Sequence, residues 1–224
     1  MEYNVTSTPG SALEINLRKG ESVIAEKGVF LYGNGLFEFH KEYEIRQGRS
    51  WLAAILGSKS MSYNKFASID NVSLVFAPED NAEIVAIPIT NTNAVFIEAD
   101  SHLARYGEIT LELKSNGVKN ALLDGWKLRA EGVGLLFIKG YGSIKEVALT
   151  EGMSFVADEE ALLAYTEGVV LKPISGGWKS FLLSGEGFLL QVSGSGTLWL
   201  QTKKEGYGAR KSGIVGAILN FFIR

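Results

Sequence analysis

The 224-residue chain contains no cysteine and only two histidines. The absence of cysteine excludes disulfide bonds, thiolate nucleophiles and cysteine-ligated metals, and it is compatible with a reducing cytoplasm. The two histidines, His40 and His102, lie far apart in the sequence and show none of the spacings typical of zinc ligands. We interpret each as a surface residue or a hydrogen-bonded strand residue. The sequence predicts no catalytic residue, no metal and no cofactor.

The chain also lacks an excess of basic residues and any long apolar run. Its formal net charge is -3 and its pI is about 5.6, which argues against a nucleic-acid partner. No apolar stretch reaches the roughly 20 residues of a membrane-spanning helix. Residues 1–20 do not show an apolar segment after a basic start, as a secretory signal would. We therefore expect a cytoplasmic protein that is not an integral membrane protein.

Proline is scarce, at 4 residues, whereas glycine is frequent, at 26. This combination is typical of tight turns between short strands. Apolar and polar residues alternate at Leu13–Arg18, Ile109–Lys114 and Thr197–Thr202, as they do on half-buried strands. Gly33-Asn34-Gly35 is a hairpin signal between two apolar runs. The sequence predicts an all-β fold: a sandwich, barrel or jelly roll.

We place the β domain at residues 1–205, with two packed β-roll halves at about 1–125 and 126–205 as one possible division. Residues 206–224 form a linker and a short apolar tail. The apolar residues of this tail fit one widened helix stripe. They are Ile214, Val215, Ile218, Leu219, Phe221 and Phe222. The tail is too short to cross a bilayer. Three options remain: docking on its own sheet, docking on a neighbouring subunit, or lying in a membrane interface.

One short pattern recurs three times along the chain. An alanine is followed directly by an acid and, seven or eight residues after the alanine, by a tyrosine. The recurring acids are Glu26, Asp100 and Asp158. The simplest interpretation is that each carboxylate accepts hydrogen bonds from backbone N–H groups of its turn. A shared ion or ligand site is the alternative. Repeated β units of this kind bury their apolar faces against one another.

A second recurring pattern consists of glycine pairs. Gly132-Val133-Gly134, an apolar strand and Gly140-Tyr141-Gly142 are echoed by Gly185-Glu186-Gly187, a strand and Gly194-Ser195-Gly196. Glycine adopts positive φ values without the Cβ penalty of other residues. We therefore predict that these pairs let the chain turn sharply into and out of a strand. They are not phosphate-binding loops, because no strand–glycine loop–helix pattern accompanies them.

Four phrases carry a resemblance to a known family. They are Gly20–Tyr32, Phe96–Leu103, Glu151–Tyr165 and Ser184–Thr202, of which the last is the most specific. The chain resembles the mitochondrial biogenesis (altered inheritance of mitochondria) family of TRAP-like β proteins. The resemblance implies a double-stranded β-helix and assembly into homo-oligomers such as trimers. It implies no reaction, and the fold name implies no RNA binding, because a fold does not fix a function.

Three functional hypotheses follow. We favour a non-enzymatic homo-oligomeric scaffold, with peripheral membrane contact through the apolar tail as one option. The alternative is a small-molecule-binding protein that uses the mouth of the β-roll. The third is an enzyme that uses the repeated carboxylates, which would require environments that separate their pKa values.

Overall fold

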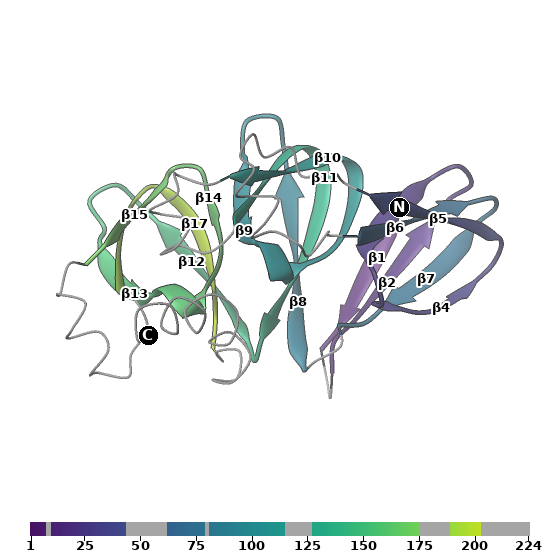
Figure 1. Cartoon of the computed structure of the whole chain (residues 1–224), viewed down its shortest axis with the longest axis horizontal. Helices are drawn as coiled ribbons and strands as arrows, with labels where there is room; N and C mark the ends of the chain where they lie inside the picture. Colours follow the sequence, from purple (N-terminus) through teal and green to yellow (C-terminus); the bar gives the residue numbers. More distant parts are fainter. Residues whose placement is uncertain (8–9, 44–61, 79–80, 115–126, 175–188, 203–224) are drawn as a thin grey trace, which may run out of the picture.

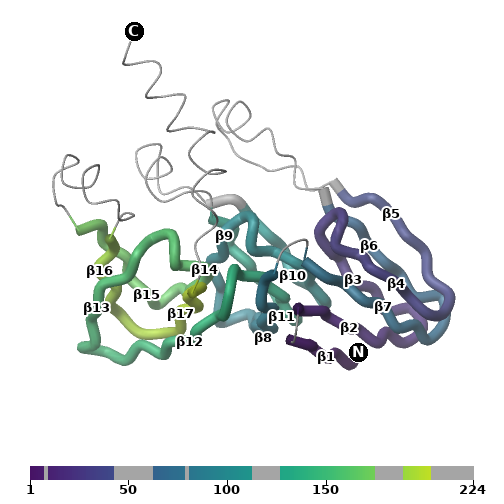
Figure 2. Tube along the Cα trace, turned by 90° about the horizontal axis from the view of Figure 1, so that it is seen from below, coloured from purple at the N-terminus to yellow at the C-terminus, as the bar shows by residue number. Residues whose placement is uncertain are grey.

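The computed structural model describes residues 1–7, 10–43, 62–78, 81–114, 127–174 and 189–202. These residues form an all-β protein, as predicted, and two single-turn 3-10 helices interrupt the described strands. Figure 1 shows three lobes in a row, and Figure 2 shows the same row from below. The elements in chain order are β1 (Glu2–Thr6), β2 (Ala12–Leu17), β3 (Ser22–Glu26), β4 (Phe30–Asn34), β5 (Phe37–Tyr43), β6 (Ser62–Ser68), β7 (Val72–Phe76), β8 (Ala82–Ile89), β9 (Val95–Glu98), η1 (Ala99–Ser101), β10 (His102–Lys114), β11 (Lys127–Tyr141), β12 (Ile144–Leu149), β13 (Phe155–Asp158), η2 (Glu159–Ala161), β14 (Leu162–Thr166), β15 (Val169–Pro173), β16 (Leu189–Gly194) and β17 (Gly196–Gln201).

One antiparallel sheet runs through all three lobes. Its strand order is β12-β17-β14-β9-β11-β10-β3-β6-β5, and β8 also pairs with β11. A second sheet, β1-β2-β7-β4, covers it in the first lobe, and a third, β13-β16-β15, covers it in the last lobe. The inward faces of these layers carry the apolar residues of the alternating strands; in β2, for example, Leu13, Ile15 and Leu17 are buried.

Each lobe is built on one long hairpin. In the first lobe, β4 pairs with β7 and β5 pairs with β6. In the second lobe, β10 pairs with β11. In the third lobe, β14 pairs with β17 and β15 pairs with β16. All three hairpins shift register by one residue at the same point, directly after the first pair. The shifts lie between Phe30 and Tyr32, between His102 and Ala104, and between Leu162 and Ala164. The bulge at each shift leaves one leucine outside the ladder.

The described residues bury their apolar side chains in three clusters, one for each lobe. The first includes Leu13, Ile15, Leu74 and Phe76, the second Ile87, Ile97, Leu136 and Ile138, and the third Leu162, Leu190, Val192 and Leu198. β10 and β11, which lie on either side of residue 125, pair with each other from His102 to Lys114.

Glycines bend the central hairpin in the middle of its strands. Gly107 pairs with Gly134, and Ile109 pairs with Gly132. Gly132 has a φ of 121°, and a Cβ at this position would collide with the backbone oxygen of Glu108. The prediction that Gly132 and Gly134 turn the chain out of a strand is therefore wrong. β11 continues through both glycines and only changes direction there.

The glycine pair Gly194 and Gly196 does lie at strand ends. Gly194 ends β16 and Gly196 begins β17, and both have positive φ values of 95° and 144°. The prediction that glycines let the chain leave and enter a strand is confirmed at these two residues. Gly185 and Gly187 lie outside the described residues.

Candidate functional site

In each lobe, one acidic residue ends the strand that precedes the hairpin. Glu26 ends β3, Glu98 ends β9 and Asp158 ends β13, each directly before the turn that leads into the lobe's hairpin. Asp100 lies inside η1 instead, two residues beyond the equivalent position. The strand-ending acid of the second lobe is therefore Glu98, which the sequence comparison missed because it aligned the copies on alanine.

Each strand-ending acid uses its carboxylate within the fold. Glu26 forms an ion pair with Lys139, and Glu98 forms one with Lys127. Asp158 caps η2 by accepting a hydrogen bond of 3.0 Å from the backbone N–H of Glu160. The predicted turn hydrogen bond is thus present at Asp158, whereas the two glutamates join strands through lysines of β11. The three acids lie in three different lobes and are not brought together.

No metal site is evident in the part of the chain that the structure describes. Among these residues, no group of three or more His, Asp and Glu side chains gathers closely enough to hold a metal ion.

A buried polar cluster lies at the joint between the first and second lobes. It consists of Tyr63, His102 and Arg105, which expose at most 3% of their surface. The Arg105 guanidinium carbon lies 4.8 Å from the centre of the Tyr63 ring, and the His102 ring packs edge-on against Tyr63 at 4.9 Å. Such cation–π and edge-to-face contacts are strongest where water is excluded.

His102 is neutral in this environment. Burial, followed by the positive charges of Arg105 and Lys139, holds the pKa of His102 well below its usual value. Neither ring nitrogen has a hydrogen-bond partner among the described residues. The interpretation of His102 as a surface or hydrogen-bonded residue is therefore wrong. For His40 the interpretation is correct, because its side chain is 60% exposed.

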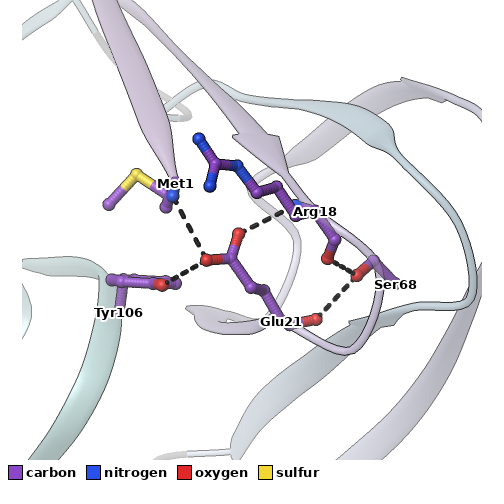
Figure 3. Close-up of polar contacts among 5 residues, drawn as sticks. All are labelled: Met1, Arg18, Glu21, Ser68 and Tyr106. Carbon is purple, nitrogen blue, oxygen red and sulfur yellow. Dashed lines mark hydrogen bonds and ion pairs between the residues drawn. The ribbon is translucent and has the colours of Figure 1, made fainter.

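A second polar network also joins the first two lobes (Figure 3). One carboxylate oxygen of Glu21 accepts hydrogen bonds from the Met1 amino group at 3.2 Å and from the Tyr106 hydroxyl at 2.8 Å. The other accepts one from the Arg18 backbone N–H at 2.8 Å. The Ser68 hydroxyl donates to the backbone oxygens of Glu21 and Arg18. Tyr106 lies on β10, so Glu21 links β10 to the turn before β3.

The network shifts two pKa values in opposite directions. Burial alone would raise the pKa of Glu21, but the hydrogen bonds from Arg18 and Tyr106 and the charge of the Met1 amino group lower it below its usual value. Burial and the bond to Glu21 raise the pKa of Tyr106. Glu21 is thus charged and Tyr106 is neutral at physiological pH, which is the pairing that the hydrogen bond requires.

The lobes are joined by strand pairing and by the leucines of the hairpin bulges. β10 of the second lobe pairs with β3 of the first, and β14 of the third lobe pairs with β9 of the second. Leu103 belongs to the core cluster of the first lobe and is fully buried, and Leu163 belongs to that of the second and is 3% exposed. Each bulge leucine therefore fills the core of the preceding lobe.

The first lobe has the same hairpin, but no described residues pack against it on the side that a preceding lobe would occupy. Its bulge leucine, Leu31, is 60% exposed. β4 is an edge strand, and Phe30 and Tyr32 beside Leu31 are exposed as well. At the other end of the row β13 is also an edge strand, and its Val156 is 57% exposed. Both outer edges of the described fold therefore carry exposed apolar side chains.

The structure does not describe the predicted apolar tail. Ile214, Val215, Ile218, Leu219, Phe221 and Phe222 lie outside the described residues. Among the residues that are described, no helix is long and apolar enough to cross a membrane.

The succession of bulged hairpins can be compared with known proteins. Residues 3–203 match the family described as mitochondrial biogenesis AIM24. The chain belongs to this family. The match spans all three lobes, and it confirms the resemblance seen in the four sequence phrases.

Two relatives of this AIM24 family member are informative. An uncharacterised protein of Streptococcus pyogenes serotype M6 is 22% identical over 201 residues, which cover 85% of this chain and 80% of the relative. The crystal structure of protein SPYM3_0169 from Streptococcus pyogenes superimposes with a TM-score of 0.71 at 19% identity, and it covers 98% of this chain and 99% of that chain. At this level of identity the likeness shows a shared fold, and it carries no activity over to this chain.

Proposed function

We propose that this protein is a non-enzymatic scaffold that works as a homo-oligomer. The observation that supports the proposal is the exposed apolar surface on and beside β4. Phe30, Leu31 and Tyr32 lie on the edge strand itself, and Leu36 and Phe39 follow in the connection and in β5. Contiguous apolar surface on a sheet edge typically marks an interaction site, because an open edge presents unpaired backbone groups to another strand.

The contacts of the strand-ending acids support a structural rather than a catalytic role. Glu26 and Glu98 form ion pairs with lysines, and Asp158 caps a helical turn. A catalytic pair of carboxylates requires environments that separate the pKa values of two neighbouring groups. These acids lie in separate lobes, each with its own partner, so the proposal assigns them to fold architecture.

The finer description of the fold is also part of the proposal. A double-stranded β-helix arises when a long hairpin folds over on itself. The central hairpin bends at Gly107 and Gly132, and the outer two hairpins break into two strand pairs at the corresponding place. These bends support three double-stranded β-helix units, with TRAP-like packing between them.

We further propose a cytoplasmic location, no nucleic-acid partner, and a trimer as the simplest assembly. The net charge of -3 supports the exclusion of nucleic acid. Peripheral membrane contact is assigned to the tail, whose apolar side chains include Ile218, Leu219 and Phe222, with Arg224 beside them. Such a segment suits an anionic membrane surface, where apolar burial and positive charge act together.

Sedimentation velocity of the full chain over a wide concentration range tests the scaffold proposal. We expect a species larger than the monomer whose proportion grows with concentration. A chain that stays monomeric at all concentrations would contradict the proposal.

Co-sedimentation with vesicles tests the membrane part. The full chain and a variant that ends at residue 209 are compared on anionic and on neutral lipid vesicles. Retention of the full chain alone, on anionic vesicles, supports the tail as the contact. If both chains co-sediment with the vesicles to the same extent, the tail is not the membrane contact, and the oligomer proposal is unaffected.

A further inference from the structure

The strand pairing that joins the first and second lobes is short. β10 pairs with β3 through three residue pairs, Ala104 with Ala25, Arg105 with Ile24 and Tyr106 with Val23. The same strand pairs with β11 from His102 to Lys114. Separation of β10 from β3 therefore breaks far fewer backbone hydrogen bonds than separation of β10 from β11. Proteins open locally where the fewest contacts must be broken, so this joint is a point at which the folded chain can open.

His102 lies at one end of this joint and is buried without a hydrogen bond. The residue is 1% exposed, and its ring packs edge-on against Tyr63 of β6 in the first lobe. Neither ring nitrogen has a hydrogen-bond partner among the described residues. A buried polar group without a partner lowers stability, so the histidine is not explained by packing.

The equivalent positions of the other lobes are apolar. The residue directly before the bulge leucine is Phe30 in the first lobe, His102 in the second and Leu162 in the third. Leu162 is 1% exposed, as His102 is, and it belongs to the core cluster of its lobe. The fold therefore accepts a leucine at this position, and the histidine distinguishes the first joint from the second.

The charged groups around His102 oppose a positive charge on its ring. On β10, the Arg105 guanidinium carbon lies 4.8 Å from the centre of the Tyr63 ring, and on β11 Lys139 supplies a second positive charge. β3 contributes Glu26, whose carboxylate is already paired with Lys139. β6 contributes Tyr63, which is uncharged. A protonated ring would therefore be a buried cation beside two others.

The acids that precede His102 in the chain do not change this balance. Glu98 forms an ion pair with Lys127, and Asp100 in η1 is exposed. The electrostatic contributions at His102 come from Arg105 and Lys139, and both disfavour protonation.

We propose that His102 is a pH sensor of the first joint, and that protonation of its ring at acidic pH separates β10 from β3 within the folded protein. The charged ring is hydrated when the joint is open and is not hydrated when it is closed, so the open form binds the proton. Opening withdraws Leu103 and Ala104 from the core cluster of the first lobe and exposes apolar surface. The inference is independent of the proposed oligomer, because it concerns contacts within one chain.

The polar network at the other end of the joint does not titrate in the same pH range. Tyr106 forms the last pair of the ladder, and its hydroxyl donates a hydrogen bond of 2.8 Å to Glu21 (Figure 3). The pKa of Glu21 is lowered below its usual value of 4.5. This hydrogen bond therefore stays intact where a histidine becomes charged, and the opening begins at the His102 end.

Hydrogen exchange of the full chain tests the inference. It is measured at about pH 7.5 and about pH 5.5, because histidines titrate between these values and ordinary carboxylates stay ionised. Protection factors, which correct for the direct effect of pH on exchange, are compared for those amides of residues 23–25 and 104–106 that bond across the joint. We expect them to fall about tenfold, since binding of one proton changes the opening constant by up to tenfold for each pH unit below about 6.5. Amides of residues 164–166 at the second joint should keep their protection.

Two matched variants assign the effect to this histidine. His102→Leu gives the first joint the residue type that Leu162 provides at the second, and it should remove the fall in protection. His40→Leu is the control, because the His40 side chain is 60% exposed, and it should leave the fall unchanged. Circular dichroism should show the same folded spectrum for both variants.

A reversible lock provides a second test that keeps His102 in place. The natural chain contains no cysteine, so Ala25→Cys combined with Ala104→Cys introduces a single thiol pair, at residues directly opposite each other in the joint. Opposite Cα atoms in an antiparallel ladder lie about 4.5–5.5 Å apart, within the roughly 4.4–6.8 Å that a disulfide spans. The oxidised form should lose the pH dependence of protection, and the reduced form should show it.

The outcomes decide the inference without reference to assembly. A fall in protection at the first joint alone, absent from His102→Leu and from the oxidised double variant, supports it. Unchanged protection at the lower pH or an equal fall in His102→Leu overturns it. An equal fall at both joints also overturns it, because the chain then unfolds as a whole. The proposed oligomer is tested separately by sedimentation velocity.

Discussion

Leu31 and Leu103 occupy the same bulge position in two copies of one hairpin, yet Leu31 is 60% exposed and Leu103 is fully buried. The difference arises from what lies beside each hairpin. Leu103 enters the core of the lobe before it, whereas the first lobe has no predecessor in the described chain. The local sequence makes the same structural element three times, and the position of that element in the row decides whether its leucine stabilises a core or remains at the surface.

The first prediction concerns the bulge leucines. Leu103→Ala should lower the free energy of unfolding by about 2–5 kcal/mol, the usual cost of removing a fully buried leucine side chain. Leu31→Ala, studied at a dilution where the chain is monomeric, should change it by less than about 0.5 kcal/mol, as surface substitutions do. Denaturant titration measures both. Equal costs at the two positions would contradict the assignment of Leu103 to a neighbouring core.

The second prediction concerns the bend of the central hairpin. Gly132→Ala should destabilise the protein by at least about 1–3 kcal/mol, because alanine at a φ of 121° is strained and its Cβ would meet the backbone oxygen of Glu108. Gly10→Ala is the control, since a Cβ there meets nothing within 4 Å and the φ of Gly10 is not positive. Thermal unfolding compares the two variants. A melting temperature for Gly132→Ala as high as that of Gly10→Ala would contradict the steric argument.

The third prediction concerns pH and His102. Because the folded pKa of His102 lies well below 6.5, the unfolded chain binds a proton that the folded chain does not. Stability is therefore complete above the unfolded pKa and falls as the pH drops below about 6.5, by up to ~1.4 kcal/mol for each pH unit. His102→Leu should reduce this slope. His40→Leu, at an exposed position, should not. Chemical denaturation at a series of pH values from 7 downward checks both variants.

The fourth prediction concerns the link between Glu21 and Tyr106. The folded pKa of Glu21 is lowered, so its contribution to stability is present above its usual pKa of 4.5 and is lost as the pH falls through the folded pKa. Glu21→Gln should cost about 1–3 kcal/mol at pH 7, since hydrogen bonds to a charged group are lost, and much less at low pH. In a double-mutant cycle with Tyr106→Phe, the double variant should lose less stability at pH 7 than the sum of the two single losses. Additive effects would mean that the 2.8 Å hydrogen bond does not stabilise the fold.

Much of the fold could be predicted from local patterns. Alternation at Leu13–Leu17 gave the buried face of β2 correctly, and the frequent glycines with few prolines indicated short strands and turns. These features depend on neighbours in the sequence, so the sequence contains them directly. The pattern of a strand, an acid and a turn was also visible, because each copy is contiguous along the chain.

The alignment of the copies could not be predicted in the same way. The spacing pattern makes Tyr32, Tyr106 and Tyr165 equivalent, but Tyr32 directly follows its bulge, where the other lobes have Ala104 and Ala164. Tyr106 and Tyr165 lie three and two residues after their bulges, so the spacing to a tyrosine differs from lobe to lobe. In the second lobe the alanine and acid of the pattern, Ala99 and Asp100, fall inside η1 rather than at the strand end. Leu31, Leu103 and Leu163 were the better markers, because they share residue type and position.

The candidate sites depend on contacts between distant segments, and sequence patterns do not contain these. His102 and Arg105 have the composition of a solvated strand, but pairing of β10 with β3 buries both beside Tyr63. Leu31 has the same local pattern as Leu103, and only the order of the lobes distinguishes an open edge from a closed joint.

The placement of Leu103 and Ala104 in the core of the first lobe also affects how the chain can fold during synthesis. When the ribosome has produced the first 76 residues, every strand of the first lobe exists, but the side chains that complete its core have not yet been made. The lobe can close only after the next hairpin begins, and the second lobe waits in turn for Leu163. Until Leu163 has been made, a nascent chain therefore carries an unfinished core near its growing end, where chaperones that bind exposed apolar surface would act.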